Sequence, residues 1–284
     1  MDIQEIVRKV VEELSKEKAF PIGNTAKATE QIINFPEERI NGVDDPHNAS
    51  AIERAQGITP ARIGIGRSGT RMKTTSYLQF LIDHAAAKDA VLRDVSDEFL
   101  RKMDLNKLET KANDMKSYLM DLDAGRKLSD ESVAWLKENG DKGQDVQIIV
   151  CDGLSSSAVE ANIEDLLPAL MQGLQLKNIS VAKPFFIKRS RVWVQDEVAS
   201  IVDCKLVISL IGERPGLHTD ESLSAYMIYR PTETSVEADR TVISNIHKGG
   251  LAPVEAGAHL SELIEQMLLA ECTGVSFARK SSFK

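Results

Sequence analysis

The sequence has few of the features that mark secreted, membrane-embedded or nucleic-acid-binding proteins. Its three cysteines are scattered and form no CxxC pair: Cys151, Cys204 and Cys272. We therefore expect free thiols in a reducing cytoplasm rather than disulfides or a metal site. No apolar run approaches the roughly 20 residues that a membrane helix needs, and the N-terminal apolar residues lie between charges, unlike those of a signal peptide. The formal net charge of -8 argues against broad binding to nucleic acid or anionic membranes.

The composition is that of an ordinary globular protein. The 284 residues are 42% hydrophobic and 27% charged, enough for a sizeable core and for more than one domain or subdomain. We predict three parts: an N-terminal amphipathic helix and linker over residues 1–45, a mainly helical domain over residues 46–142, and an α/β domain over residues 143–284.

Residues 1–17 are predicted to form an amphipathic helix. The apolar residues recur at helical spacing: Ile3, Ile6, Val7, Val10, Val11 and Leu14. A stripe of this kind must be buried on something. Two interpretations are open: the helix docks on its own domain, or it binds a partner or a shell.

The segment from residue 47 to residue 140 has mainly helical periodicity. Helices are predicted over Thr74–Ala87, over the more polar stretch Glu98–Leu122, and over Ser129–Lys137, which opens with a capping signal at Ser129. The only strand candidate in this segment lies around Ile63 and Ile65.

After Gly143 the pattern changes to strands that alternate with helices. The predicted strands are Val146–Val150, Ile179–Val181, Phe185–Ile187, Leu206–Ile211 and Leu223–Tyr229. The predicted helices are one bearing Val159, Ile163, Leu166, Leu167 and Leu170, a short one over Glu197–Val202, and one over Val254–Leu269. This alternation indicates an α/β fold with a mostly parallel, Rossmann-like sheet flanked by helices.

The tract from Leu206 to Tyr229 carries the clearest candidate site. A buried strand ends in the charged loop Gly212–Gly216, which contains Glu213 and Arg214. Open α/β sheets usually bind ligands at the carboxyl ends of their strands, so this loop is expected to face a ligand.

Residues Gly64–Gly69 match the GxGxxG dinucleotide pattern as a string. The preceding strand is at most four residues long, no βαβ unit surrounds the glycines, and the lysine of a P-loop is absent. The alternatives are a nucleotide site or a basic turn in which Arg67, Arg71 and Lys73 contact an anionic group of a partner or cofactor.

A serine-rich turn, Asp152–Ser157, joins a predicted strand to a predicted helix. Its serines can cap the helix, and the free N–H groups there can also receive an acceptor oxygen of a ligand. The turn lacks the GxSxG pattern of a nucleophile elbow.

Several strings in the chain closely resemble the small subunit of ethanolamine ammonia-lyase, an adenosylcobalamin enzyme. In chain order they are IGIGRSGTR, FLIDHAAAKDAV, LDAGRKLS, VCDGLSS, IGERPGL, SLSAYMIY, VEADRTVISNIHKGG and PVEA. The resemblance covers roughly residues 45–278.

The resemblance implies that the chain works only with a large subunit, a TIM barrel that holds the substrate. The complex converts ethanolamine to acetaldehyde and ammonia by a radical mechanism. The small subunit covers adenosylcobalamin at the subunit interface, while the cofactor carries the reactive chemistry. No catalytic residue is then expected on this chain.

Three positions match cobalamin contacts of the resembled family: Val192, Glu213 and Val242. Valines can pack on the flat apolar corrin, and a carboxylate can accept N–H bonds from its amides. Other members can carry cysteine at position 242, so a contact of Val242 must use its backbone or van der Waals surface. Core packing would also explain both valines, and an ion pair with Arg214 or with the large subunit would also explain Glu213.

The string from Asn245 to Gly250 resembles the Asp-x-His-x-x-Gly signature of proteins whose histidine binds cobalt, with Asn in place of Asp. Because the resembled family keeps the cofactor's own base on cobalt, we interpret His247 as a structural histidine at a glycine turn. His47, His84, His218 and His259 are isolated and are expected at surface or hydrogen-bonded positions.

Enzymes of this family are often packaged in a bacterial microcompartment, where a helix such as residues 1–17 can bind the shell. The resemblance thus implies a cytoplasmic protein within such a compartment. Two other hypotheses are a nucleotide-binding regulatory protein that uses Gly64–Gly69, and a microcompartment adaptor without catalysis.

Overall fold

The computed structural model describes residues 41–59 and 61–281. The helix predicted over residues 1–17 lies outside them. The helices are α2 (Ala49–Ile58), α3 (Thr74–Leu92), α4 (Asp97–Lys102), α5 (Met115–Met120), α6 (Asp130–Asn139), α7 (Ser156–Leu176), α8 (Val194–Val202), α9 (Pro253–Ala270) and α10 (Gly274–Ser281), with 3₁₀ turns at Ala124–Arg126 and Glu237–Asp239. The strands are β1 (Arg67–Ser68), β2 (Arg71–Met72), β3 (Asn106–Glu109), β4 (Val146–Cys151), β5 (Phe185–Lys188), β6 (Leu206–Gly212), β7 (Leu223–Tyr229) and β8 (Thr241–Ile246).

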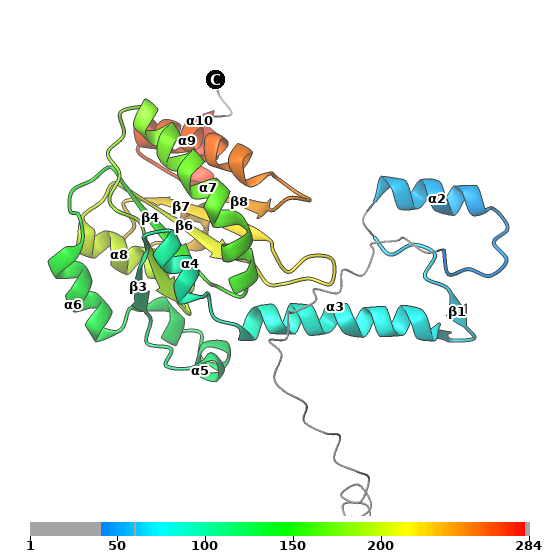
Figure 1. The fold of residues 1–284 in the computed structure, drawn as a ribbon. Helices are drawn as coiled ribbons and strands as arrows, with labels where there is room; N and C mark the ends of the chain where they lie inside the picture. Colours follow the sequence, from blue (N-terminus) through cyan, green and yellow to red (C-terminus); the bar gives the residue numbers. More distant parts are fainter. Residues whose placement is uncertain (1–40, 60, 282–284) are drawn as a thin grey trace, which may run out of the picture.

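In the described part of the chain, six strands form one sheet in the order β3-β5-β4-β6-β7-β8. The pairs β3–β5, β5–β4 and β4–β6 are parallel, whereas β6–β7 and β7–β8 are antiparallel. The predicted α/β class with a mostly parallel sheet is therefore confirmed (Figure 1).

Helices cover both faces of this sheet and bury its central strands. Every residue of β4 and β6 is buried, because side chains on both faces of these strands meet a helical layer. On one face, α7 and α9 pack their apolar residues on the sheet: Val159, Ile163, Leu166, Leu170, Leu260, Ile264 and Met267. On the other face, α8 and α6 contribute Val194, Val198, Val202 and Leu136.

The helix predicted over Glu98–Leu122 is wrong as a continuous element. The structure ends α4 at Lys102, turns through Asp104 at φ 52°, and continues as β3, which pairs with β5 at the edge of the sheet. In β3 only Leu108 is buried, so the strand lacks the alternating pattern that reveals a strand in a sequence. The sheet thus takes one edge strand from the region predicted to be helical.

Two other predicted strands are also wrong. No strand forms around Ile63 and Ile65, because Gly64 and Gly66 both adopt φ 71°, which interrupts an extended backbone. At residues 179–181 there is a single bridge, between Val181 and Val146, rather than a strand.

The first described residues form an arm that projects from the rest of the molecule (Figure 1). We define the arm as residues 41–59 and 61–92, and the body as residues 93–281. The arm contains α2, the short β1–β2 hairpin and α3. It meets the body where the Ser156 hydroxyl donates to the Ala90 carbonyl and where the Arg62 guanidinium donates to the Leu217 carbonyl.

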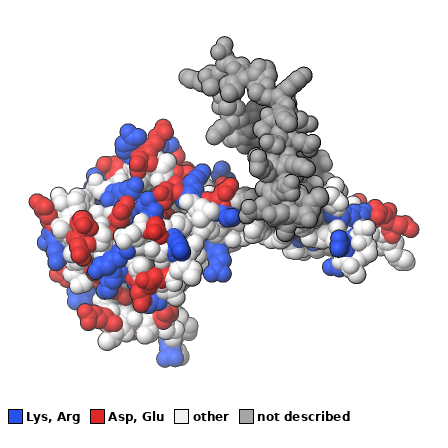
Figure 2. All heavy atoms as spheres, turned by 90° about the horizontal axis from the view of Figure 1, so that it is seen from below, with Lys and Arg blue, Asp and Glu red and all other residues white. Residues whose placement is uncertain are grey.

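Positive and negative side chains are interspersed on the face of the body shown in Figure 2. Several of them pair across elements, such as Lys102 with Glu164 and Lys188 with Asp94. Within the described ranges, no helix combines the length and apolar character needed to cross a membrane.

Candidate functional site

The loops after β4 and β6 meet at the carboxyl edge of the sheet. The amide of Leu154 donates to the carbonyl of Gly212 at 3.0 Å. A Cβ at Gly153 would come within 2.3 Å of that same carbonyl oxygen, and a Cβ at Gly212 would come within 2.1 Å of the Ser155 carbonyl oxygen. Glycine at both positions therefore allows the two loops to touch, which fixes where Glu213 leaves the sheet.

The carboxylate of Glu213 is held in place by groups at the start of β7 and on β8. The Ser222 hydroxyl donates to Oε2 at 2.9 Å, the Ser224 hydroxyl donates to Oε1, and the amide of Asn245 donates to Oε1 at 3.1 Å. Asn245 itself adopts the left-handed backbone conformation, with φ 64°. The side chain is partly exposed, so the carboxylate has a fixed position with acceptor capacity left toward solvent.

Glu213 therefore does not owe its position to an ion pair. Among the described residues, the ion pairs include neither Glu213 nor Arg214. The predicted alternative of a salt bridge within the chain does not hold, and the serine hydroxyls and one backbone amide take its place.

Tyr226 on β7 is related by separate observations to each of the three residues that the sequence singles out. Burial, and secondarily the negative charge of Glu213, raise the pKa of the Tyr226 hydroxyl. Tyr226 is the strand partner of Val242 on β8. Its backbone carbonyl accepts a hydrogen bond of 2.7 Å from the side-chain amide of Gln195 on α8, and the backbone amide of Gln195 donates to the carbonyl of Val192, just before that helix. Val192 and Tyr226 both pack against the apolar cluster beneath α8, Val242 is the strand partner of Tyr226, and the charge of Glu213 acts on the Tyr226 hydroxyl.

The two valines differ in how far they are buried. Val192 is partly buried against the cluster beneath α8, whereas Val242 is 39% exposed on the edge strand β8. Packing in the core, one of the two explanations considered from the sequence, largely accounts for a valine at position 192. It does not account for Val242, whose side chain is open to a partner or ligand.

Two polar atoms near Tyr226 are buried and unpartnered in the described structure. They are Oε1 of Gln195 and Oγ of Ser209, and both residues are fully buried. Ser209 is the β6 partner of Tyr226. A buried polar atom without a partner costs roughly 1–3 kcal/mol, and because both atoms are closed off from solvent they lie beneath the surface of the candidate site.

Tyr226, Gln195 and Ser224 were not predicted from the sequence. The signal for two of them was present, because residues 224, 226 and 228 of an antiparallel strand share one face. The contribution of α8 could not be found in this way, since it depends on how that helix packs on the sheet.

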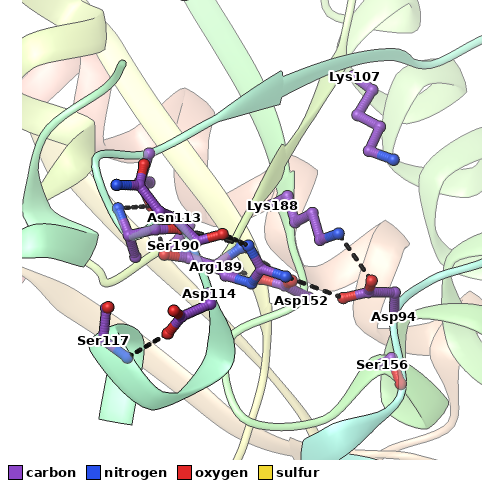
Figure 3. A network of polar contacts seen from close by, with 12 residues as sticks. Asp94, Lys107, Asn113, Asp114, Ser117, Asp152, Ser156, Lys188, Arg189 and Ser190 are labelled. Atoms are coloured by element: carbon purple, nitrogen blue, oxygen red, sulfur yellow. Dashed lines mark hydrogen bonds and ion pairs between the residues drawn. The ribbon is translucent and has the colours of Figure 1, made fainter. Parts of the chain in front are cut away.

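A second polar network holds the ends of β4 and β5 together (Figure 3). The buried carboxylate of Asp152 accepts N–H bonds from Arg189 at 2.8 Å and from Ser190 at 3.3 Å. Burial raises the pKa of Asp152 to about 6, although these backbone bonds oppose the rise. The guanidinium of Arg189 donates to the Asn113 carbonyl at 2.6 Å. The network is structural, because it ties the edge of the sheet to the loop before α5.

The serine turn after Asp152 is a helix cap, as one of the two interpretations had it. The Ser155 hydroxyl accepts from the amide of Ala158 at 3.0 Å and opens α7. The prediction that Ser129 caps α6 is also confirmed, since it accepts from the amide of Ser132.

The GxGxxG string lies in the hairpin of the arm rather than in a nucleotide fold. Arg67 pairs with Met72 and Ser68 pairs with Arg71 in the antiparallel β1–β2 pair. The dinucleotide fingerprint needs a parallel strand that feeds a helix, so this geometry disfavours a nucleotide site. Of the three basic residues in this segment, Lys73 forms an ion pair with Asp44.

His247 has the structural role expected from its glycine turn. Its Nδ1 accepts from the amide of Gly249 at 3.1 Å, and its Nε2 lies 2.9 Å from Oδ1 of Asn245. Both ring nitrogens are therefore engaged within the chain. Among the described residues, no group of three or more His, Cys, Asp or Glu side chains is placed to hold a metal ion.

Comparison with known proteins shows the family of this chain. A family model for the ethanolamine ammonia-lyase light chain matches residues 49–278. A curated relative from Clostridium perfringens, named ethanolamine ammonia-lyase small subunit, is 44% identical over 272 residues, which are 95% of this chain and 90% of the relative. A relative of the same name from Clostridium tetani is 47% identical over a stretch that covers 82% of this chain and 79% of the relative. Another from Listeria monocytogenes is 45% identical over 82% of this chain and 80% of the relative. The chain therefore belongs to the ethanolamine ammonia-lyase light-chain family.

Proposed function

We propose that this chain is the small subunit of an adenosylcobalamin-dependent ethanolamine ammonia-lyase, and that the face around Tyr226 covers the cofactor at the interface with a TIM-barrel large subunit. Family membership supports the activity, since the relatives carry the name of this enzyme. The pairing of Val242 with Tyr226, the packing of Val192 and Tyr226 on one cluster and the charge of Glu213 near the Tyr226 hydroxyl support the cofactor face.

The residues present fit the chemistry of a corrin, a flat apolar macrocycle fringed with amides. Val242 and the partly exposed ring of Tyr226 offer apolar surface. The fixed and partly exposed carboxylate of Glu213 can accept an amide N–H. The ring nitrogens of His247 are engaged with Asn245 and Gly249, in keeping with a cofactor that retains its own base.

When bound, adenosylcobalamin supplies the radical chemistry of the deamination. The residues of this chain orient the macrocycle and exclude water from one side of it. Glu213 acts as an acceptor of fixed position rather than as an acid or base for the substrate, because three donors already hold its carboxylate. Catalytic groups are assigned to the large subunit.

The observation that carries this proposal is the position of Glu213. Its carboxylate is held by Ser222, Ser224 and Asn245 at the carboxyl edge of the sheet, beside a tyrosine whose strand partner is an exposed valine. A carboxylate on a surface turn without a binding role would not need three hydrogen bonds from its own chain.

Purification of the chain with and without its large subunit tests the function. The chain alone should show no lyase activity, whereas the complex should deaminate ethanolamine and retain adenosylcobalamin through gel filtration. Activity of the isolated chain, or a complex that is active without retaining the cofactor, would contradict the proposal.

The location within a microcompartment is proposed from the sequence pattern of residues 1–17. Deletion of these residues should leave the activity of the purified complex unchanged but release the enzyme from the compartment in cells. Normal encapsulation of the truncated chain would remove the support for this location.

A further inference from the structure

Helix α3 presents an apolar stripe that the chain itself does not cover, within the residues that the structure describes. Leu78, Leu81, Ile82 and Ala85 share one face of the helix because they are spaced at i, i+3, i+4 and i+7. Leu78 is 53% exposed, and Leu81 and Ile82 are each 41% exposed. Soluble proteins rarely leave contiguous apolar surface of this kind in water unless it binds something.

Other side chains of α3 make the contacts that attach the helix. The Ser76 hydroxyl donates to the Ile65 carbonyl at 2.6 Å, and Asp83 forms an ion pair with Arg62. Ala90 is the buried residue of the helix. These contacts lie on the opposite face of α3 from the stripe. They fix the orientation of the helix, so the stripe points away from the arm and the body.

The arm is also linked to the loop that carries Glu213. The guanidinium of Arg62 contacts Asp83 on α3 and donates to the carbonyl of Leu217 at 2.6 Å. Leu217 belongs to the β6–β7 loop, between Glu213 and Ser222, and Figure 1 shows this loop beside α3. A partner seated on α3 is therefore adjacent to the edge of the sheet where Glu213 lies.

We propose that the stripe formed by Leu78, Leu81, Ile82 and Ala85 is a docking surface for the large subunit. The inference rests on the proposed function, and three observations select this occupant. The relatives are named small subunits, which implies a larger partner. The family match begins at residue 49, so it includes α3 but not residues 1–40. The link through Arg62 and Leu217 joins the stripe to the proposed cofactor edge.

The test measures the affinity of the full-length chain for the purified large subunit in the absence of adenosylcobalamin. Leu81→Asp and Leu78→Asp should each weaken binding by about tenfold or more, as loss of a central apolar interface residue usually does. Leu269→Asp is the matched control, because Leu269 is 81% exposed on α9 of the body. This control should bind like the wild type.

Circular dichroism and thermal unfolding of each variant establish whether it folds. If Leu81→Asp fails to fold, Leu81→Ala replaces it and should weaken binding in the same direction by a smaller factor. Unchanged affinity in all folded stripe variants would overturn the proposal.

Other occupants give other outcomes, and each would also overturn it. If the stripe joins two copies of this chain, sedimentation would show that Leu81→Asp abolishes self-association without weakening binding to the large subunit. If residues 1–40 cover the stripe, Leu81→Asp would leave the affinity of the full-length chain unchanged and alter only the chain that lacks these residues.

The assay separates this inference from the cofactor proposal. Glu213→Ala should leave assembly with the large subunit unchanged, since it lies outside the stripe. Weakened assembly in the stripe variants, together with normal cobalamin retention in Glu213→Ala, would support the docking surface and contradict the cofactor face.

Discussion

The body and the arm of this chain use apolar residues in opposite ways. In the body, Leu166, Leu170 and Ile264 of α7 and α9 are fully buried on the sheet. In the arm, α3 directs Leu78, Leu81 and Ile82 toward solvent. The body therefore carries its own core, whereas the arm leaves an apolar surface exposed among the described residues, as the proposed docking surface requires.

This difference separates two functions within one subunit. The body holds Glu213 and Tyr226 in fixed positions because strands and helices on both faces surround them. The arm carries no comparable polar cradle among its described residues, and its apolar stripe suits attachment. A rigid site and a projecting attachment element can then vary independently.

Large-to-small substitutions should affect the two regions very differently. Leu166→Ala in the body should lower the free energy of unfolding of the isolated subunit by about 2–5 kcal/mol, because it leaves a cavity in a fully buried cluster. Leu81→Ala in the arm should change it by less than about 0.5 kcal/mol. Urea unfolding of both variants measures this contrast. An equal loss for Leu81→Ala would mean that the stripe is already buried in the free chain.

Replacing a glycine by alanine should change the stability of the subunit in opposite directions in the two regions. In the body, Gly212→Ala places a Cβ within 2.1 Å of the Ser155 carbonyl oxygen and should destabilise by about 1–3 kcal/mol. In the arm, the Cβ of Gly57→Ala meets nothing within 4 Å, and alanine in α2 should stabilise by up to about 1 kcal/mol. Thermal unfolding checks both signs. A stabilising Gly212→Ala would show that the two loops after β4 and β6 do not touch in solution.

Burial in the body also predicts a pH dependence of stability. Burial raises the pKa of Asp152 from its usual 3.8 to about 6. The folded state therefore holds this proton more tightly than the unfolded state, so the contribution of Asp152 is full below about pH 4 and is lost as the pH rises through about 6. Asp152→Asn cannot titrate. The stability of the wild type relative to this variant should fall between pH 4 and pH 7, and a constant difference over that range would contradict the assignment.

The sequence predicted the parts of the fold whose burial leaves a pattern. Strands β4, β6 and β7 were found because they are apolar over most of their length, and α7 and α9 because their buried residues recur at helical spacing. Strand β3 was missed because it buries only Leu108. A strand was wrongly predicted around Ile63 and Ile65, because the positive φ of Gly64 and Gly66, which makes this segment irregular, cannot be read from the sequence. Edge strands and positive-φ glycines are set by tertiary contacts that local patterns do not contain.

The candidate site was predictable only in part for the same reason. The resemblance pointed to Val192, Glu213 and Val242, but their relation to Tyr226 depends on the reversal of β7 and β8 and on the packing of α8. The serines that hold Glu213 follow from that reversal as well. No spacing in the sequence encodes these contacts.

The central claim is that the fixed carboxylate of Glu213 contacts the cofactor. Its most direct test is the dissociation constant of adenosylcobalamin from the assembled complex that carries Glu213→Ala, with Glu233→Ala as the control in the exposed loop after β7. Loss of one charge-assisted hydrogen bond should weaken binding by about tenfold or more in the first variant, and the control should match the wild type. An unchanged dissociation constant for Glu213→Ala, in a complex that assembles normally, would contradict the account.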